Sequence, residues 1–187
     1  MFSDIYPTVT IGNTAEIAEL VKQHQLDIGI VEGHFKDEDQ LDIKEIAKDE
    51  MVIVASYDNK LARKGEISVR DLVGETWILR EIGSGTREAA ETIFKNMEFT
   101  PNQVIHFSST QSIKEAVEAG LGISLLSRWA IQKELELGYL QILPVAGLPF
   151  RRQFSTVTTS PFQTKALKIF IELLINQKEL TDFGRER

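Results

Sequence analysis

Strand-like and helix-like patterns of apolar residues alternate along this chain. Runs typical of strands lie at residues 7–12, 26–32 and 51–56, and a helical pattern begins near Thr14. A further strand-like run ends near Arg80. The remaining strand-like runs cover residues 103–109, 123–127, 140–145 and 152–160. Such alternation predicts an α/β fold in which most strands are parallel.

The predicted helices have recognisable ends. Asn13 can cap the first helix, and Glu16, three residues later, completes the spacing of a capping box. Gly138 stands where a short helix over residues 128–137 needs a left-handed C-terminal cap. In the last helix, one face carries four apolar residues, namely Leu167, Phe170, Ile171 and Leu174. This face is expected to pack inward.

The composition is that of a globular protein without cysteine chemistry. Of the 187 residues, 42% are apolar, which suffices for one large domain or two lobes. The lack of cysteine excludes disulfides, thiolate zinc sites and cysteine nucleophiles. No secretion signal and no apolar run of membrane-spanning length is found, so we expect a cytoplasmic protein with no membrane contact.

The charge balance argues against DNA binding by this chain alone. Its formal net charge is −7, and a phosphate backbone attracts basic surfaces. Arg151 and Arg152 form the only adjacent arginine pair, which is typical of a solvated turn.

A glycine-containing loop between a strand and a helix is the most informative motif. In LREIGSGTREAAETIF, residues 79–94, the lysine of a Walker loop is absent, and Glu88 occupies the third glycine position of a dinucleotide fingerprint. The start of a helix, with hydroxyls from Ser84 and Thr86, still favours a carboxylate or another oxyanion. Alternatively, these residues only cap the helix.

Catalysis is the weakest functional class. His24, His34 and His106 are isolated, and none has the spacing of a metal site. His24 continues the apolar face of the first helix, and His106 lies inside a strand, so structural roles are expected. The sequence contains no nucleophile elbow, and we predict no catalytic residues, no metal and no cofactor.

Three segments in this order, residues 9–33, 49–88 and 108–131, resemble the effector-binding domain of LysR-type transcriptional regulators. The resemblance covers nearly the whole chain. The VEG at residues 31–33 and the GSGTR at residues 83–87 look most like regulators of sulfur assimilation or cysteine metabolism and of carbon fixation. It is the ordered set of segments that carries the resemblance.

The resemblance implies two Rossmann-like α/β lobes joined by two crossover strands, as in type 2 periplasmic binding proteins. Lobe one would comprise residues 1–57 and 157–187, and lobe two residues 58–156. The family's first strand and helix of lobe one have no counterpart here. The DNA-reading helix-turn-helix also has none, so DNA would be contacted only through an N-terminal domain absent from this chain.

The resemblance also implies a small-molecule effector in the cleft between the lobes, at the carboxyl ends of strands. The residues selected are Asn13, Thr14, Glu32, Gly33, Gly83, Ser84, Gly85, Thr86, Arg87, Ser109 and Thr110. Helix starts converging there would favour an anion. Glu32 would oppose an anion unless it pairs with Arg87 or with a ligand amine, and it can also be a solvated loop acid. For Arg87 we favour the surface, because a cation opposes the helix dipole there.

Family likeness further implies a homodimer or tetramer. Two alternatives remain open. One is a periplasmic-binding-protein-like solute-binding protein or a dehydratase-like enzyme of the same two-lobed fold. The other is a dimerisation module whose cleft binds no effector.

Overall fold

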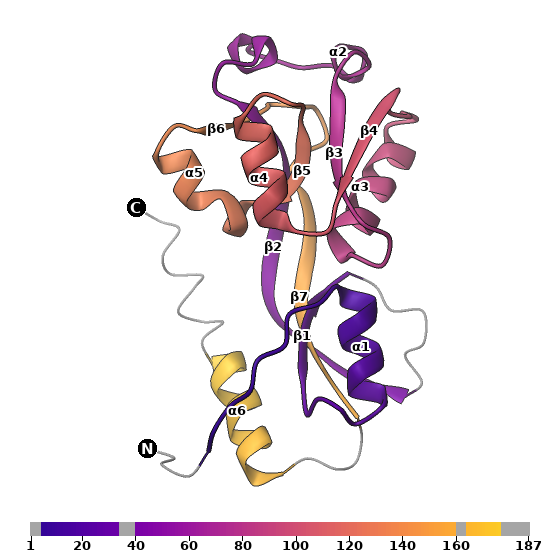
Figure 1. The fold of residues 1–187 in the computed structure, drawn as a ribbon, viewed down its shortest axis with the longest axis vertical. Helices are drawn as coiled ribbons and strands as arrows, with labels where there is room; N and C mark the ends of the chain where they lie inside the picture. The colour runs from indigo at the N-terminus through magenta and orange to yellow at the C-terminus, as the bar shows by residue number, and fades with distance from the viewer. Residues whose placement is uncertain (1–4, 34–39, 160–163, 177–187) are drawn as a thin grey trace.

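Two long strands run through the molecule and link its two ends (Figure 1). The computed structural model describes residues 5–33, 40–159 and 164–176. Strands β2 (Asp42–Ser56) and β7 (Phe150–Thr158) pair antiparallel, from Asp42 opposite Thr158 to Met51 opposite Phe150. The register shifts between Glu45 and Ala47. Because both strands pass from one end to the other, they form the connection between two lobes.

Lobe one, at the lower end of Figure 1, is the smaller of the two. It contains α1 (Thr14–Lys22), β1 (Gly29–Glu32), α6 (Lys165–Asn176) and the lower parts of β2 and β7. Strand β1 pairs antiparallel with β7. The core of this lobe is formed by Ile17, Ala18, Val21, Val31, Leu41 and Val157.

Lobe two is built around the upper part of β2, which is buried on both faces. Met51, Ile53 and Ala55 point into one apolar cluster, and Val52 and Val54 into another, as the two-residue period of a strand requires. The surrounding elements are η2 (Lys60–Arg63), α2 (Val69–Leu72), β3 (Thr76–Arg80), α3 (Gly85–Asn96), β4 (Gln103–Phe107), α4 (Thr110–Glu118), β5 (Ser124–Ser127), η3 (Arg128–Ile131), α5 (Gln132–Glu136) and β6 (Leu140–Ile142).

Two expectations about strands are wrong. Residues 7–12 form no strand; their apolar side chains are exposed, including Val9 and Ile11. The larger sheet, in the order β1-β7-β2-β5 with β6 beside β2, is antiparallel at every pairing, whereas β3 and β4 pair in parallel. Apolar alternation identifies a strand, but it contains no information on the direction of its partner.

The predicted helix ends are confirmed. Asn13 and Glu16 form the capping box of α1, and Gly138 adopts a φ of 74° after α5. On α6, Leu167 and Ile171 are buried as expected, but Phe170 is exposed. Within the described ranges, no helix has the length and apolar character that crossing a bilayer requires.

Candidate functional site

Three of the predicted loops meet where the lobes touch. The Thr14 hydroxyl donates to the Glu32 carbonyl oxygen at 2.8 Å, which joins the start of α1 to the end of β1. The backbone N–H of Ala15 donates to the Gly83 carbonyl oxygen at 3.1 Å, which joins α1 to the loop before α3. The structure brings these loops together as expected. Hydrogen bonds join them directly to one another.

Gly85 permits the closest approach between the lobes. A Cβ atom at Gly85 would lie 2.0 Å from the backbone oxygen of Glu32, and one at Gly33 would lie 3.2 Å from the Gly85 Cα. Only a hydrogen at Cα leaves room for such a backbone contact. The glycines of GSGTR thus serve the packing of lobe two against lobe one.

At the start of α3, one hydroxyl caps the helix and the other contacts lobe one. The Ser84 side chain is the N-cap and accepts a hydrogen bond from the Thr86 backbone N–H. Both residues are buried. The Thr86 hydroxyl is not used for capping and donates to Glu32 Oε1 at 3.4 Å. Of the two predicted hydroxyls, that of Thr86 therefore faces the other lobe.

Arg152 on β7 lies at the centre of this contact, and the sequence interpretation missed it. Its Nε donates to Asp49 Oδ2 at 2.8 Å, its Nη1 to Thr86 Oγ1 at 3.4 Å, and its Nη2 lies 3.6 Å from Glu32 Oε1. The Arg152 side chain is 7% exposed. One guanidinium group thus contacts both lobes and the strand that links them.

Asp49 on β2 anchors the arginine. It is fully buried, and its Oδ1 accepts a hydrogen bond from the Ser127 hydroxyl at 2.7 Å. A buried carboxylate is tolerated when it is paired and hydrogen-bonded. Ser127 and Arg152 together satisfy both oxygens of Asp49.

Arg151 and Arg152 lie in strand β7 and not in a turn, so the solvated-turn interpretation is wrong, although Arg151 is solvated as expected. Arg151 is 79% exposed and lies 3.9 Å from Glu50. Successive side chains of a strand point to opposite faces, so β7 turns Arg152 inward together with Phe154. The alternating strand predicted at residues 152–160 already indicates that Arg152 faces inward, because it places Arg152 on the same face as the apolar Phe154.

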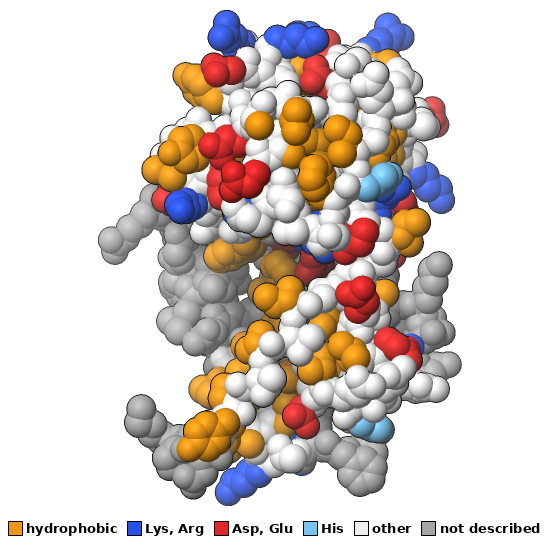
Figure 2. Space-filling model, viewed as in Figure 1, with side chains coloured by type: hydrophobic (Ala, Val, Ile, Leu, Met, Phe, Trp, Pro, Cys, Tyr) orange, Lys and Arg blue, Asp and Glu red, His pale blue; other side chains and the backbone are white. Residues whose placement is uncertain are grey.

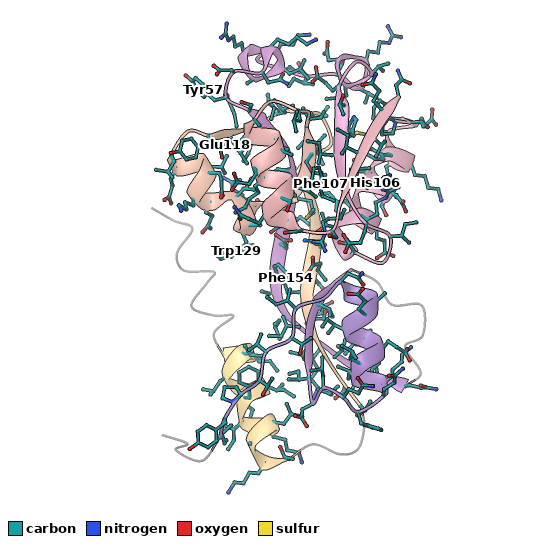
Figure 3. All side chains as sticks on the ribbon, viewed as in Figure 1. Tyr57, His106, Phe107, Glu118, Trp129 and Phe154 are labelled. Carbon is teal, nitrogen blue, oxygen red and sulfur yellow. The ribbon has the colours of Figure 1, made fainter. Side chains whose placement is uncertain are left out.

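Phe154 provides an apolar wall beside the guanidinium group. The Arg152 Cζ lies 5.9 Å from the centre of its ring, and Phe154 stands opposite Glu32 in the β1–β7 register. Figure 3 places Phe154 at the waist between the lobes. Figure 2 shows that the surface is hollowed at this waist, with acidic and basic side chains at its base. The arrangement offers a charged and an apolar contact next to each other.

The remaining predicted residues lie apart from Glu32. Arg87 donates to Glu91 Oε1 at 2.6 Å and lies 3.0 Å from His106 Nδ1, so the alternative in which Glu32 pairs with Arg87 is wrong. Ser109 caps α4. The Thr110 hydroxyl accepts a hydrogen bond from Arg80 at 2.9 Å.

Arg80 also forms a two-point ion pair with Glu81. Its Nε and Nη2 lie 2.7 and 2.9 Å from the Glu81 oxygens. The hydrogen bonds from Arg80 lower the pKa of Glu81 despite its partial burial, and those to Glu81 raise the pKa of Arg80. The bond from Arg80 to Thr110 links the end of β3 to the start of α4.

The histidines offer no metal site within the described ranges, where no group of three His, Asp or Glu residues could hold an ion. His24 follows the end of α1 with a φ of 57° and is exposed, so its expected place on the apolar helix face is wrong. His106 lies in β4 as expected. His34 is outside the described residues.

Comparison with known proteins gives consistent matches. The family model described as LysR substrate binding domain matches residues 2–179. The HTH-type transcriptional regulator CysL of Bacillus subtilis is 38% identical over 93% of this chain and 58% of its own length. For the HTH-type transcriptional regulator CbbR of Rhodospirillum rubrum, the identity is 39% over 84% of this chain and 53% of the relative. The chain thus spans little more than half of these regulators.

Solved structures have the same fold. The Synechocystis CcmR regulatory domain in complex with 2-PG superposes with a TM-score of 0.81 at 27% identity, over 89% of this chain and 80% of that one. The effector-binding domain of QuiR in complex with shikimate has a TM-score of 0.79 at 18% identity, over 90% and 79%. The two-lobed fold expected from the resemblance is confirmed.

Proposed function

Because the chain belongs to the family of LysR substrate-binding domains, we propose that it is the effector-sensing domain of a LysR-type transcriptional regulator. Its ligand is a small anionic metabolite bound between the lobes. The observation that carries this proposal is the position of the Thr86 hydroxyl, which lies 3.4 Å from both Glu32 Oε1 and Arg152 Nη1. The CcmR domain, solved with 2-PG, supports a small-molecule ligand here.

The proposed contact residues follow from this geometry. Thr86 and Arg152 provide hydrogen-bond donors, and Phe154 provides an apolar wall. The start of α1 and the end of β1 provide the opposite side, with Asn13, Thr14, Glu32 and Gly33. Gly83, Ser84 and Gly85 shape the loop. Thr110 bonds to Arg80 and Ser109 caps α4, so neither is proposed as a direct ligand contact. Arg87 is left out because it is bonded to Glu91. The division of the chain into two lobes remains part of the proposal, with the first boundary placed before Met51 and not near residue 57, because Met51 to Ala55 pack in the core of lobe two.

A thermal-shift screen tests the proposal. The compounds are sulfate, phosphate, 2-PG, acetylserine-like amino acids and small dicarboxylates. A true ligand at a hundredfold excess over its dissociation constant should stabilise the fold by about 2.7 kcal/mol. Thr86→Val removes the cleft hydroxyl at nearly constant volume and should reduce that stabilisation. Thr92→Val is the matched control, because Thr92 lies on α3 with its hydroxyl bonded to the Glu88 carbonyl and is exposed.

Two results would count against the proposal. If no compound stabilises the parent chain, the cleft is not an effector site for this set of metabolites and a dimerisation module becomes the better account. If a ligand stabilises the parent and Thr86→Val equally, the ligand binds elsewhere.

We also propose that the chain self-associates, with a dimer as the basic unit. Exposed apolar side chains on lobe one support this, among them Tyr6, Val9 and Ile11 at 88, 81 and 94% exposure. Figure 2 shows apolar side chains along this face, and such patches mark interaction sites. Sedimentation should give a dimer at roughly tens of micromolar; a monomer at that concentration contradicts the proposal.

For the whole protein we propose regulation of transcription, with DNA read by a part outside this chain. The support is that CysL and CbbR are HTH-type regulators of which this chain matches 58 and 53%. A cytoplasmic location belongs to this proposal because a regulator acts where DNA is. In a low-salt gel shift, this chain alone should not retain a duplex in a sequence-dependent manner.

A further inference from the structure

The two ends of the Arg152 guanidinium group are held very differently. Its Nε forms a short bond of 2.8 Å to Asp49, whose other oxygen is fixed by Ser127. Charge-assisted hydrogen bonds between nitrogen and oxygen are typically about 2.7–2.9 Å long. The Asp49 contact is therefore a full-strength anchor, and it fixes the orientation of a planar group that cannot lose its charge.

The outer nitrogens of Arg152 are only loosely engaged. Nη1 lies 3.4 Å from Thr86 Oγ1 and Nη2 lies 3.6 Å from Glu32 Oε1. An arginine has four N–H donors on these two nitrogens, and the side chain is 7% exposed. With the described residues, these donors form only long contacts, and they do so at a place where water has little access. They are available to an oxyanion that approaches more closely than Glu32 does.

Glu32 is the partner that can be displaced. It shares one guanidinium group with Asp49, so two carboxylates face a single positive charge. Asp49 is fully buried, whereas the Glu32 side chain is 26% exposed. Glu32 ends β1 and is followed by Gly33 with a φ of 105°. Displacement of Glu32 into solvent costs far less than displacement of Asp49, because only the latter would expose a buried anchor.

We propose that Glu32 is a built-in competitor of the ligand. In the free protein its carboxylate occupies the place beside the Arg152 outer nitrogens and the Thr86 hydroxyl, and a carboxylate or phosphate group of the ligand replaces it there. Glu32 belongs to lobe one and Thr86 to lobe two, so the exchange replaces a direct interlobe contact with a ligand-mediated one. This inference rests on the proposed function, and it deepens that function by identifying Arg152 as the anion receptor.

The test compares charge-removing variants, with inorganic phosphate as the probe in calorimetric titrations. Glu32→Gln keeps the size of the side chain and removes the competing charge. It should tighten phosphate binding by about tenfold, which corresponds to about 1.4 kcal/mol. Glu91→Gln is the control: it removes one charge from a 57% exposed glutamate on α3 and should leave the affinity unchanged. Arg152→Lys, which keeps a charge next to Asp49 but loses the forked donors, should weaken binding by about tenfold or more.

The outcomes separate this inference from the proposed function. Unchanged or weaker phosphate binding by Glu32→Gln overturns the competitor role, and so does the failure of phosphate to bind either form. If Glu32→Gln instead loses an amino acid that binds the parent chain, Glu32 receives a ligand amine; the inference is then wrong while the effector-sensing function stands. The proposed function itself fails if none of the screened metabolites binds the parent chain, or if a ligand stabilises the parent chain and Thr86→Val equally.

Discussion

Arg152 and Asp49 form the polar centre of the molecule, and their stability effects should be large. Removal of the Arg152 charge would leave Asp49 buried, with the Ser127 hydroxyl as its remaining side-chain hydrogen-bond partner among the described residues. Breaking a buried ion pair on one side costs about 3–5 kcal/mol. We therefore expect Arg152→Gln to lower the free energy of unfolding by about that amount in urea titrations.

Arg151→Gln is the matched control at the neighbouring position. Arg151 is 79% exposed and lies 3.9 Å from Glu50, and exposed ion pairs contribute only about 0–1 kcal/mol. If the two variants unfold at the same urea concentration, the Arg152–Asp49 pair does not stabilise the fold as described.

At the scale of single residues, the sequence identified hydroxyls and glycines better than charges. A loop before a helix has few possible roles, which favours Ser84, Gly85 and Thr86. Gly85 and Thr86 contact Glu32 of lobe one, and Ser84 caps the helix. Arg152 was missed because the importance of a strand residue depends on the face it occupies and on distant partners. Its contacts with Asp49 and Thr86 span 103 and 66 residues of sequence.

The packing of α5 on α4 depends on an ion pair that titrates. Lys114 Nζ donates to Glu134 Oε1 at 2.7 Å and to the Ala130 carbonyl oxygen at 3.1 Å. Burial raises the pKa of Glu134, but the hydrogen bonds from Lys114 and from its own backbone, together with the charge of Lys114, outweigh burial and lower it below 4.5. A lowered carboxyl pKa contributes stability above the unfolded value, and this contribution is lost as the pH falls below it.

We therefore expect Glu134→Gln to flatten the acid side of the stability profile. The parent chain should lose more stability than the variant as the pH falls from about 6 towards about 3. The measurement is chemical denaturation at a series of pH values. Parallel curves for the two proteins would show that the Lys114–Glu134 pair does not carry the acid sensitivity.

The start of α3 lies against the end of β1 only because Gly85 has no side chain. A Cβ there would lie 2.0 Å from the Glu32 carbonyl oxygen, so Gly85→Ala should push α3 away from lobe one and cost about 1–3 kcal/mol. Gly74→Ala is the control, because nothing lies within 4 Å of a Cβ at that position. Equal unfolding midpoints for the two variants would contradict the tight contact.

At the scale of elements, local signals were reliable and pairing signals were not. The Asn13–Glu16 capping box and the Gly138 cap form as expected, because their chemistry lies within a few residues. Residues 7–12 alternate like a strand but pair with no described strand. Strand pairing needs a partner from elsewhere in the chain, and a local pattern cannot provide one.

The architecture of the whole molecule follows from the course of β7, which runs antiparallel to β2 through both lobes. Phe150–Thr158 pairs with β2 in both lobes, so the last described strand connects the same two lobes as a strand about 100 residues earlier. Periodicity could not predict this connection, because it depends on long-range pairing. The ordered resemblance to a family did predict two crossover strands, and the CcmR regulatory domain superposes on this fold with a TM-score of 0.81.

We propose above all that an anion binds between the lobes at Thr86 and Arg152. The most direct measurement is a crystal structure of the chain with a ligand found in the thermal-shift screen. We predict an anionic group within about 3 Å of the Thr86 hydroxyl and of the Arg152 outer nitrogens, with the Glu32 carboxylate moved away. A ligand bound elsewhere, with Glu32 still beside Arg152, would contradict the account.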